Sequence, residues 1–221
     1  MSSAIKFENV SFSYSDLPVL NDVSFDIKFG EFVAIVGENG AGKSTTMKLM
    51  LRQLVPNSGL ISLFGSDINQ TTRFSDVAYL SQSATEHYKN FPTTIRELVV
   101  NHLSYLRKDI DVAQLVEVVD LSQRMDFKLC ELSGGQLQRV GLLLALIRDC
   151  KLILLDEPIA GVDKKFSLEY IQMLKKLSDK GCAVVMITHD LACCRKGYDR
   201  ILRVEGGHIV EEDTSCLLMI S

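Results

Sequence analysis

Hydrophobic residues near the start of the chain first alternate with polar residues and then form one continuous run. Residues 5–13 and 23–27 alternate, which is typical of antiparallel strands with one buried face, and Leu17-Pro18 lies between them as a turn region. The run Phe32-Val33-Ala34-Ile35-Val36 has the length of a fully buried strand. The pattern therefore predicts an antiparallel β part followed by a buried strand.

Farther along the chain, short apolar runs alternate with amphipathic stretches. Helices are predicted at 46–54 and 164–180. Strands are predicted at 60–65, 77–80, 151–156 and 182–187, and a hairpin at 201–211 precedes a short helix at 214–219. Strands that alternate with helices predict an α/β fold with a mainly parallel sheet, to which the first strands add an antiparallel β subdomain.

Between the strands at 77–80 and 151–156, the chain predicts helices only. Thr94 and Glu97 form a capping box that opens a helix to about Tyr105, and Asp111 opens a second helix. A third, rich in leucine, runs over 137–148. Consecutive helices predict an inserted helical lobe. The first two helices place it at about 91–130, and the third extends it to about 149.

Length, composition and charge restrict the class of protein. A chain of 221 residues with 47% hydrophobic and 24% charged residues is typical of one globular domain and not of a disordered chain. The net charge of −4 gives no reason to expect nucleic-acid binding. We find no signal peptide and no apolar run long enough to span a membrane. Any membrane role therefore requires a separate subunit.

Six cysteines are present without a C-x-x-C pair or a zinc-ligand spacing, so we expect reduced thiols in the cytosol.

A glycine-rich loop follows the buried strand at 32–36. Its sequence, Gly37-Glu38-Asn39-Gly40-Ala41-Gly42-Lys43-Ser44-Thr45, matches the phosphate-binding P-loop pattern at every fixed position. Its glycines let backbone N–H groups approach a phosphate, and the helix that follows adds its positive N-terminal dipole. We expect Lys43 to neutralise the β- and γ-phosphate oxygens and Ser44 to hold Mg²⁺. The ligand predicted here is a nucleotide.

Two adjacent carboxylates end the predicted strand at 151–156. Such a pair beside an apolar run is costly unless it serves a cation or a polar site. Asp156 suits the role of a Mg²⁺ ligand, and Glu157 is placed to polarise an attacking water. The sequence therefore predicts hydrolysis of the bound nucleotide.

Four further signals each permit two interpretations from the residues alone. Tyr14, expected on a loop, either stacks on a base or packs in the core. Gln82 either caps a turn or meets ligand. The segment Leu132-Ser133-Gly134-Gly135-Gln136 is either a well-capped helix start or an anion site. His189, after a buried strand, is either structural or catalytic.

These motifs, taken in order over essentially the whole chain, resemble the nucleotide-binding subunit of ATP-binding cassette (ABC) transporters. The resemblance depends on the P-loop, Gln82, the segment 132–136, Asp156-Glu157 and His189. It implies a single domain over 1–221 with a P-loop NTPase, RecA-like core. This core, with its antiparallel β part, covers about 1–90 and 150–221, and the helical lobe about 91–149.

The resemblance also implies roles for individual residues. Tyr14 stacks on adenine, Gly40 to Thr45 hold the phosphates, and Ser44, Gln82 and Asp156 surround Mg²⁺, directly or through water. Glu157 is the general base and His189 senses the γ-phosphate. In the family, Ser133, Gly134, Gly135 and Gln136 form a signature that acts on the ATP of the opposite subunit, and Asp163 matches a loop that crosses the dimer interface. Implied partners are therefore a second such subunit and membrane permeases at the cytoplasmic face of the membrane.

The sequence indicates the transported substrate less clearly than it indicates the ATP-hydrolysing subunit. Residues 79–82 and 91–95 resemble the subgroup that serves zinc, manganese or iron importers, which work with an extracytoplasmic substrate-binding protein. Glu86 and His87 suggest metal contact, but a solvated loop explains them better. The alternatives are the motor of an exporter of peptide, lipid or drug, an ABC protein acting on ribosomes or DNA, and a nucleotide-binding subunit without turnover.

Overall fold

The structure is a computed structural model and describes residues 2–81, 91–159, 164–189 and 197–212. The predicted helix at 214–219 lies outside these residues. The strands are β1 (Ser3–Tyr14), β2 (Leu17–Lys28), β3 (Phe32–Val36), β4 (Ser58–Leu63), β5 (Ser66–Asp67), β6 (Val77–Leu80), β7 (Leu152–Asp156), β8 (Ala183–Ile187), β9 (Arg200–Glu205) and β10 (His208–Glu212). The α-helices are α1 (Lys43–Met50), α3 (Ile95–Leu106), α4 (Ala113–Val118), α5 (Gly134–Arg148) and α6 (Lys164–Asp179).

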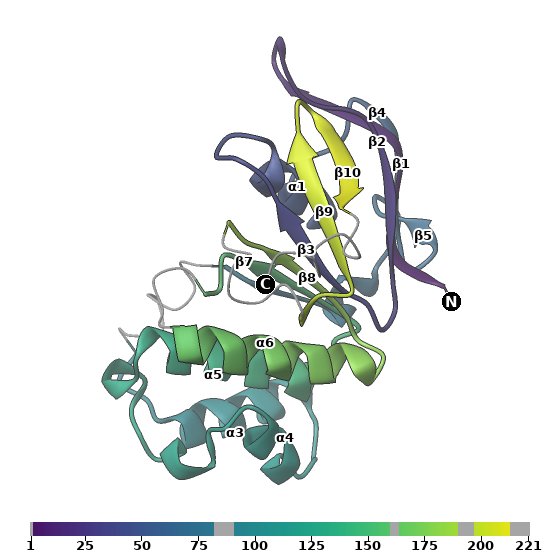
Figure 1. The fold of residues 1–221 in the computed structure, drawn as a ribbon. Helices are drawn as coiled ribbons and strands as arrows, with labels where there is room; N and C mark the ends of the chain where they lie inside the picture. The colour runs from purple at the N-terminus through teal and green to yellow at the C-terminus, as the bar shows by residue number, and fades with distance from the viewer. Residues whose placement is uncertain (1, 82–90, 160–163, 190–196, 213–221) are drawn as a thin grey trace.

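Two sheets enclose α1 (Figure 1). The four-stranded sheet has the order β2-β1-β4-β5 and is antiparallel. The six-stranded sheet has the order β10-β9-β3-β8-β7-β6; β9, β3, β8, β7 and β6 run parallel, and β10 pairs antiparallel with β9. The predicted fold class, an α/β fold with a mainly parallel sheet and an N-terminal antiparallel part, is therefore confirmed.

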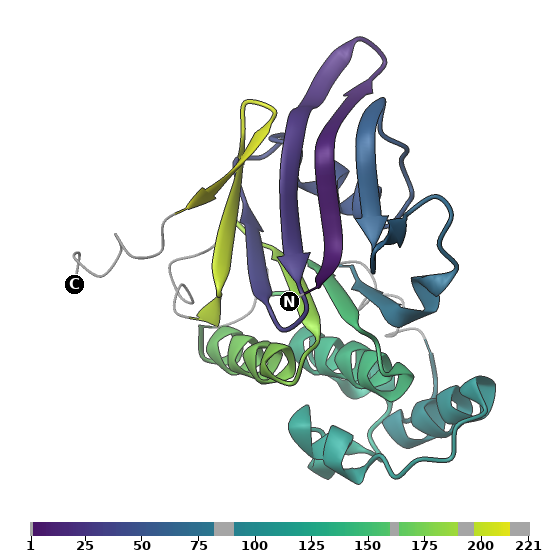
Figure 2. The same ribbon diagram turned by 90° about the vertical axis from the view of Figure 1, so that its right-hand side faces the viewer.

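Alternating side chains of the buried strands supply two cores. Val33 and Ile35 of β3 face α1 and the antiparallel sheet, where Met47 of α1 is buried. Ala34 and Val36 face the other side, which α5 and α6 cover. Helices α3 and α4 lie beyond α5 and α6, farthest from the sheets (Figure 2). Because both of their faces are covered, the central strands β3 and β8 are apolar throughout.

The prediction of a turn at Leu17-Pro18 was wrong. Both residues belong to β2, and the turn is formed by residues 15–16 directly before it, where Ser15 has a φ of 52°. Strand β2 is at the edge of its sheet. Proline is tolerated at an edge because its missing N–H leaves no partner strand without a donor. Tyr14, which we expected on a loop, is accordingly the last residue of β1.

The helices of the predicted lobe begin where their capping residues indicate. Thr94 accepts a hydrogen bond from the Glu97 backbone N–H, and the Glu97 carboxylate accepts one from the Thr94 backbone N–H, so the capping box is present. Helix α4 begins at Ala113, two residues after Asp111, and the Asp111 carboxylate accepts a hydrogen bond from the Ala113 N–H. The division into a core and a lobe stays a prediction.

Candidate functional site

The carboxyl ends of β3, β8 and β7 lie side by side, and each delivers polar residues to the same edge of the sheet. In the register of the sheet, Ile187 lies beside both Ile35 and Asp156. The P-loop follows β3, Asp156 ends β7 with Glu157 directly after it, and His189 follows β8. The carboxyl edge of an open α/β sheet is where ligands bind in such folds.

The P-loop turns directly into α1. Gly42 caps the helix with a φ of 112°, a conformation that costs glycine little. The helix therefore begins at Lys43, earlier than the predicted start at residue 46. Gly37 has a second constraint, since a Cβ at this position would lie 2.4 Å from the carbonyl oxygen of Val204 in β9. The loop is thus held closely against the sheet.

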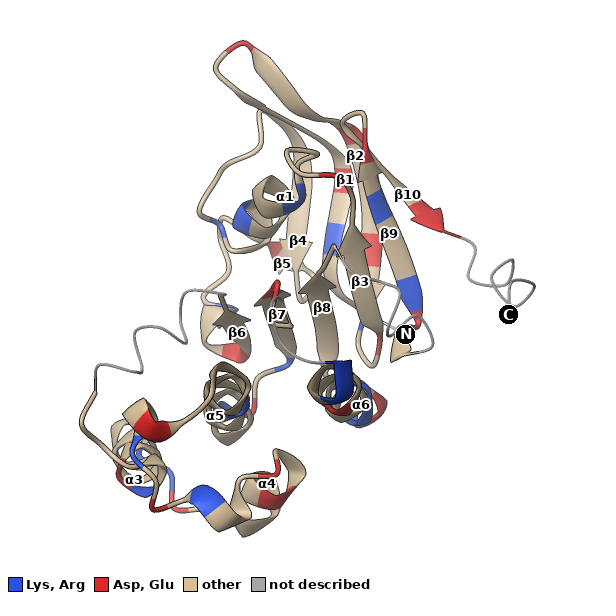
Figure 3. Cartoon of the chain, turned by 60° about the vertical axis from the view of Figure 1, so that its left-hand side comes forward, with Lys and Arg blue, Asp and Glu red and all other residues tan. Residues whose placement is uncertain are grey.

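The Lys43 side chain is buried under this loop. Its Nζ donates hydrogen bonds of 2.9 Å to the backbone carbonyls of Gly37 and Glu38. A lysine ammonium has three N–H donors, so one remains for a phosphate oxygen. The positive charge of α1 lies near the acidic end of β7, as the red tip of that strand and the blue residues of α1 show in Figure 3.

Asp156 is half-buried, and its carboxylate accepts a hydrogen bond of 3.4 Å from the hydroxyl of Tyr79 in β6. Burial, followed by the charge of Glu157, raises the pKa of Asp156 above its ordinary value. Burial and Asp156 raise the pKa of Tyr79 to about 12, so Tyr79 stays protonated and donates. Two neighbouring carboxylates that repel one another in this way favour the binding of a cation between or beside them. No local sequence pattern indicates that Tyr79 meets Asp156, because this contact depends on the pairing of β6 with β7.

Replacement of Asp156 by asparagine is expected to stabilise the protein in the absence of nucleotide and Mg²⁺. The folded-state pKa is raised, so the ionised carboxylate lowers stability at neutral pH, and this cost disappears as pH falls through the folded pKa. The advantage of Asp156→Asn should therefore be present near pH 7 and shrink on acidification. Thermal unfolding measures it, with about 2–4 °C for each kcal/mol.

The exposed Asp109 supplies the control for this experiment, since Asp109→Asn should leave the melting temperature unchanged at both pH values. A lower melting temperature for Asp156→Asn at neutral pH would contradict the expectation.

Glu157 and His189 face each other at the end of the strands. The Glu157 Oε2 lies 3.5 Å from His189 Nδ1, and 58% of the His189 side chain is exposed. Glu157 has a φ of 49°, and its N–H donates to the carbonyl of Ile187 at 3.1 Å. This positive φ is unusual for glutamate and turns the chain sharply after the strand. The carboxylate is thereby presented at the edge of the sheet, with 27% of its side chain exposed to an incoming water.

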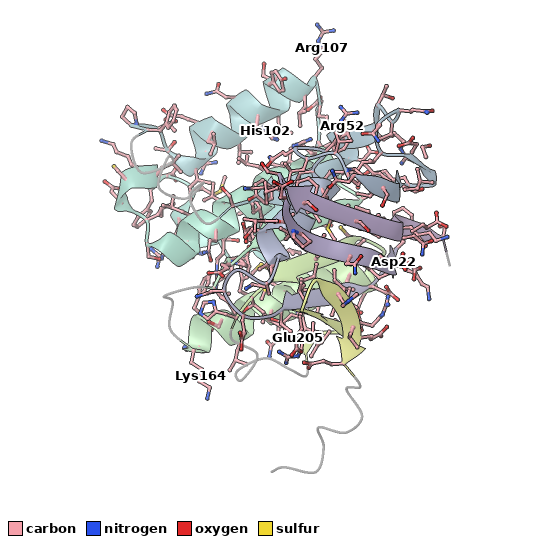
Figure 4. The ribbon with its side chains drawn as sticks, turned by 90° about the horizontal axis from the view of Figure 1, so that it is seen from above. Asp22, Arg52, His102, Arg107, Lys164 and Glu205 are labelled. Carbon is pink, nitrogen blue, oxygen red and sulfur yellow. The ribbon has the colours of Figure 1, made fainter. Side chains whose placement is uncertain are left out.

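A cleft of about 500 Å³ lies beside the P-loop. Its walls are the P-loop itself at 38–41, Pro18 and Val19 of β2, and, at 203–207, the end of β9 with the turn that follows it. Glu205, the last residue of β9, is labelled in Figure 4. Tyr14 ends β1 with 43% of its surface exposed, and its ring meets Phe12 edge to face at 4.9 Å between centroids. Packing on Phe12 leaves an aromatic surface accessible for a base.

The segment at 132–136 forms the start of α5. Ser133 accepts a hydrogen bond from the Gln136 N–H at 3.3 Å, and the Gln136 side chain accepts one from the Ser133 N–H at 2.9 Å. This capping box places Gly134 and Gly135 in the first turn, so the helix begins before the predicted Leu137. Ser133 is exposed, whereas Gly135 is buried against α6.

Two predicted site residues, Gln82 and Asp163, lie outside the described residues, as do Glu86 and His87. Within the described part of the chain, no group of three or more histidine, cysteine, aspartate or glutamate side chains is arranged to hold a metal ion. Among the described residues, Cys130, Cys150 and Cys182 form no disulfide. No described helix has the length and apolar character needed to cross a bilayer.

Comparison of the sequence with known proteins gives ATP-binding subunits of transporters, in agreement with the P-loop and carboxylates at this sheet edge. The sequence profile described as "ABC transporter" matches residues 20–160. The chain is 34% identical over 208 residues to the zinc transport system ATP-binding protein TroB of Treponema pallidum, covering 90% of this chain and 77% of TroB. It is 30% identical over 218 residues to the glutamine transport ATP-binding protein GlnQ of Bacillus subtilis, covering 94% and 89%.

A solved structure supports the fold. It is cbiO1 from Clostridium perfringens, described as part of the ABC transporter complex cbiONQ, and it superposes with a TM-score of 0.88 at 22% identity. The superposition covers 100% of this chain and 92% of cbiO1.

The fold and the strand-end cluster define an ATP-binding cassette, in which a P-loop and a pair of carboxylates share one edge of a sheet. The chain belongs to the ABC transporter family, as an ATP-binding subunit of the kind that hydrolyses ATP to drive transport together with membrane permease subunits.

Proposed function

We propose that this chain is the motor of a divalent-metal importer, and that it hydrolyses MgATP in a head-to-tail dimer. The observation that supports the motor is the convergence of Lys43, Asp156, Glu157 and His189 at the carboxyl ends of three adjacent strands. We also propose one domain over 1–221, with a core of about 1–90 and 150–221 and a helical lobe of about 91–149.

The nucleotide is held by residues of the first strands and the P-loop. Tyr14 stacks on the adenine, a contact worth about 1–3 kcal/mol per base. Residues 37–45 surround the phosphates with backbone N–H groups, and the remaining N–H of Lys43 donates to the β- or γ-phosphate. The cleft of about 500 Å³ beside the loop has the volume that a nucleotide requires.

The residues near Asp156 fit Mg²⁺. A carboxylate and the hydroxyl of Ser44 are hard oxygen ligands, and Mg²⁺ is commonly bound by one or two carboxylates together with substrate phosphates and waters. Gln82 is proposed as a further ligand, direct or through water. When bound, the ion supplies positive charge against the charge that develops on the γ-phosphate.

The chain's own residues then perform the hydrolysis. Glu157 accepts a proton from the attacking water, and His189, across from it, donates a hydrogen bond to the γ-phosphate. The exposure of both side chains leaves this edge open to solvent, where charge stabilisation is weak. A second subunit that covers the edge therefore completes the site.

We propose that the covering group is the signature of the second copy. Ser133 is exposed at the start of α5, where the helix dipole and the N–H groups of Gly134 and Gly135 favour an anion such as the γ-phosphate. Gln136 belongs to the same helix start, and Asp163 lies on the loop proposed to cross between subunits. Hydrolysis then depends on closure of the dimer.

The proposed cargo is zinc, manganese or iron. Its support is the sequence at 79–82 and 91–95 and the similarity to TroB, while the similarity to GlnQ shows that a related motor can serve another substrate. The chain is then placed at the cytoplasmic face of the membrane through its permeases, and an extracytoplasmic binding protein supplies the metal. The alternative is the motor of an exporter of peptide, lipid or drug.

The metal content of cells tests the cargo. In cells that lack this gene, one of the three metals should fall at limiting supply, and the wild-type chain should restore it while Glu157→Gln should not. Total metal is measured after growth at limiting and excess zinc, manganese and iron. Unchanged metal contents, together with phosphate release by the purified chain, would contradict import of these metals but not the ATPase motor, and the exporter would be tested next.

A further inference from the structure

The side chain of Arg139, in α5, is buried between the end of α4 and helix α6. Only 7% of it is exposed. Its Nη1 pairs with the carboxylate of Asp120, which follows α4, and its Nη2 donates to Glu169 of α6 at 2.9 Å. The guanidinium carbon lies 5.2 Å from the centroid of the Phe166 ring, also on α6. One side chain thus joins α4, α5 and α6.

An apolar side chain would fill the space between α4, α5 and α6 at a lower cost in free energy than this buried arginine. Burial of a charge is costly, and well-packed apolar residues often replace a buried ion pair without loss of stability. Arg139 Nε has no hydrogen-bond partner among the described residues, and neither has the fully buried hydroxyl of Tyr170 nearby on α6. The guanidinium therefore suits a positional role, because its planar fork fixes two carboxylates and a ring in one geometry.

The same ring connects Arg139 to the signature. A Cβ on Gly135 would lie 2.6 Å from Phe166 Cε2, so the helix backbone at Gly135 packs directly on the ring. Arg139 lies one helical turn after Gly135 and covers the same ring. Phe166 is near the start of α6, which begins at Lys164, directly after the proposed crossing loop (Figure 4).

We infer that Arg139 is a positioning residue for ATP hydrolysis: it holds the start of α5, with Ser133 and Gly135, in register with the start of α6. The inference rests on the proposed function, in which the signature acts on the ATP of the second copy. Loss of Arg139 should therefore impair turnover in the dimer and leave binding of ATP to the chain's own P-loop unchanged.

The test compares Arg139→Met, Arg139→Lys and Glu169→Gln with Arg96→Met. Arg96 also forms a bidentate ion pair with a carboxylate, that of Asp126, but this pair is exposed. Its loss should therefore leave kcat and the Kd unchanged. Arg139→Met should lower kcat by about 10- to 100-fold, since small misplacements have effects of that size. The Kd for a fluorescent ATP analogue should stay within about twofold. Arg139→Lys and Glu169→Gln should give intermediate values of kcat.

Two further measurements separate a positional role from general destabilisation. In a Ser133→Ala background, where the signature is already impaired, Arg139→Met should lower kcat by less than about twofold more. In a Glu157→Gln background, Arg139→Met should abolish ATP-dependent dimerisation, measured by analytical ultracentrifugation of the full chain.

Wild-type kcat for Arg139→Met, or an equal loss in the presence and absence of Ser133, would overturn the inference. If Arg139→Met does not fold, a wild-type kcat of folded Glu169→Gln overturns it instead. Failure of the Glu157→Gln parent itself to dimerise with ATP would overturn the proposed dimer, and with it this inference.

Discussion

Replacement of Glu157 by glutamine is expected to lower the kcat of ATP hydrolysis by about 10²- to 10⁴-fold, the contribution typical of a positioned general base. Glutamine has nearly the shape of glutamate but accepts no proton at neutral pH. The affinity for ATP should be retained, because Lys43 and the P-loop backbone are unchanged. ATP should therefore accumulate on the protein and hold it as a dimer.

The geometry explains why Glu157→Gln should affect the hydrolysis step and not the stability of the fold. Glu157 is fixed by its backbone, through the hydrogen bond from its N–H to the carbonyl of Ile187, and by the turn that its positive φ creates. The side chain itself has His189 as its partner at 3.5 Å. Substitution by glutamine preserves the backbone and permits a neutral hydrogen bond to the imidazole, so no large change in stability is expected.

Steady-state phosphate release measures the expected fall in kcat, and equilibrium binding of ATP measures the retained affinity. Glu117→Gln, the same change at an exposed position of α4, is the matched control and should hydrolyse ATP as the wild type does. Undiminished turnover by Glu157→Gln would exclude Glu157 as the base.

The elements that the sequence predicted best are those encoded by neighbouring residues. The capping boxes at Thr94 and Ser133 are both present, since each depends on residues a single turn apart. The buried strand at 32–36 is confirmed for a similar reason, as its apolar run is long enough for a strand and too short for a helix.

The sequence could not predict which strand lies at an edge. Pro18 suggested a turn, yet it belongs to β2, where only the position of that strand at the sheet edge makes proline acceptable. The order of the six-stranded sheet is equally a tertiary property, because β3 pairs with β8 and β9 from the far end of the chain.

The same distinction separates the site residues. Motif spacing indicated Lys43, Asp156, Glu157 and His189, and the structure brings them to one edge of the sheet. Tyr79 and Arg139 are absent from the predicted site, since their importance comes from contacts between distant elements. A tyrosine in a short strand and an arginine in a leucine-rich helix carry no local signal of the carboxylates that they meet.

Replacement of Lys43 by methionine is expected to weaken ATP binding and to remove hydrolysis. The methionine retains an apolar stem in a buried position but has no charge for the phosphates. A hydrogen bond to a charged group contributes about 1.5–3 kcal/mol. Its loss corresponds to a roughly 10- to 150-fold higher Kd for MgATP. Fold stability should change little, because the carbonyls of Gly37 and Glu38, freed from Nζ, lie in a loop that water can reach.

Lys48 offers a matched control on the same helix. Both lysines lower the pKa of Asp156 through their charge, but Lys48 is exposed and lies at the opposite end of α1 from the P-loop. Lys48→Met removes the same charge and should change the Kd by less than about twofold, as expected of an exposed charge screened by solvent. Equal losses for the two variants would assign the effect to net charge. A large loss for Lys43→Met alone requires direct contact with the phosphates, because only Lys43 is held by the loop that surrounds them.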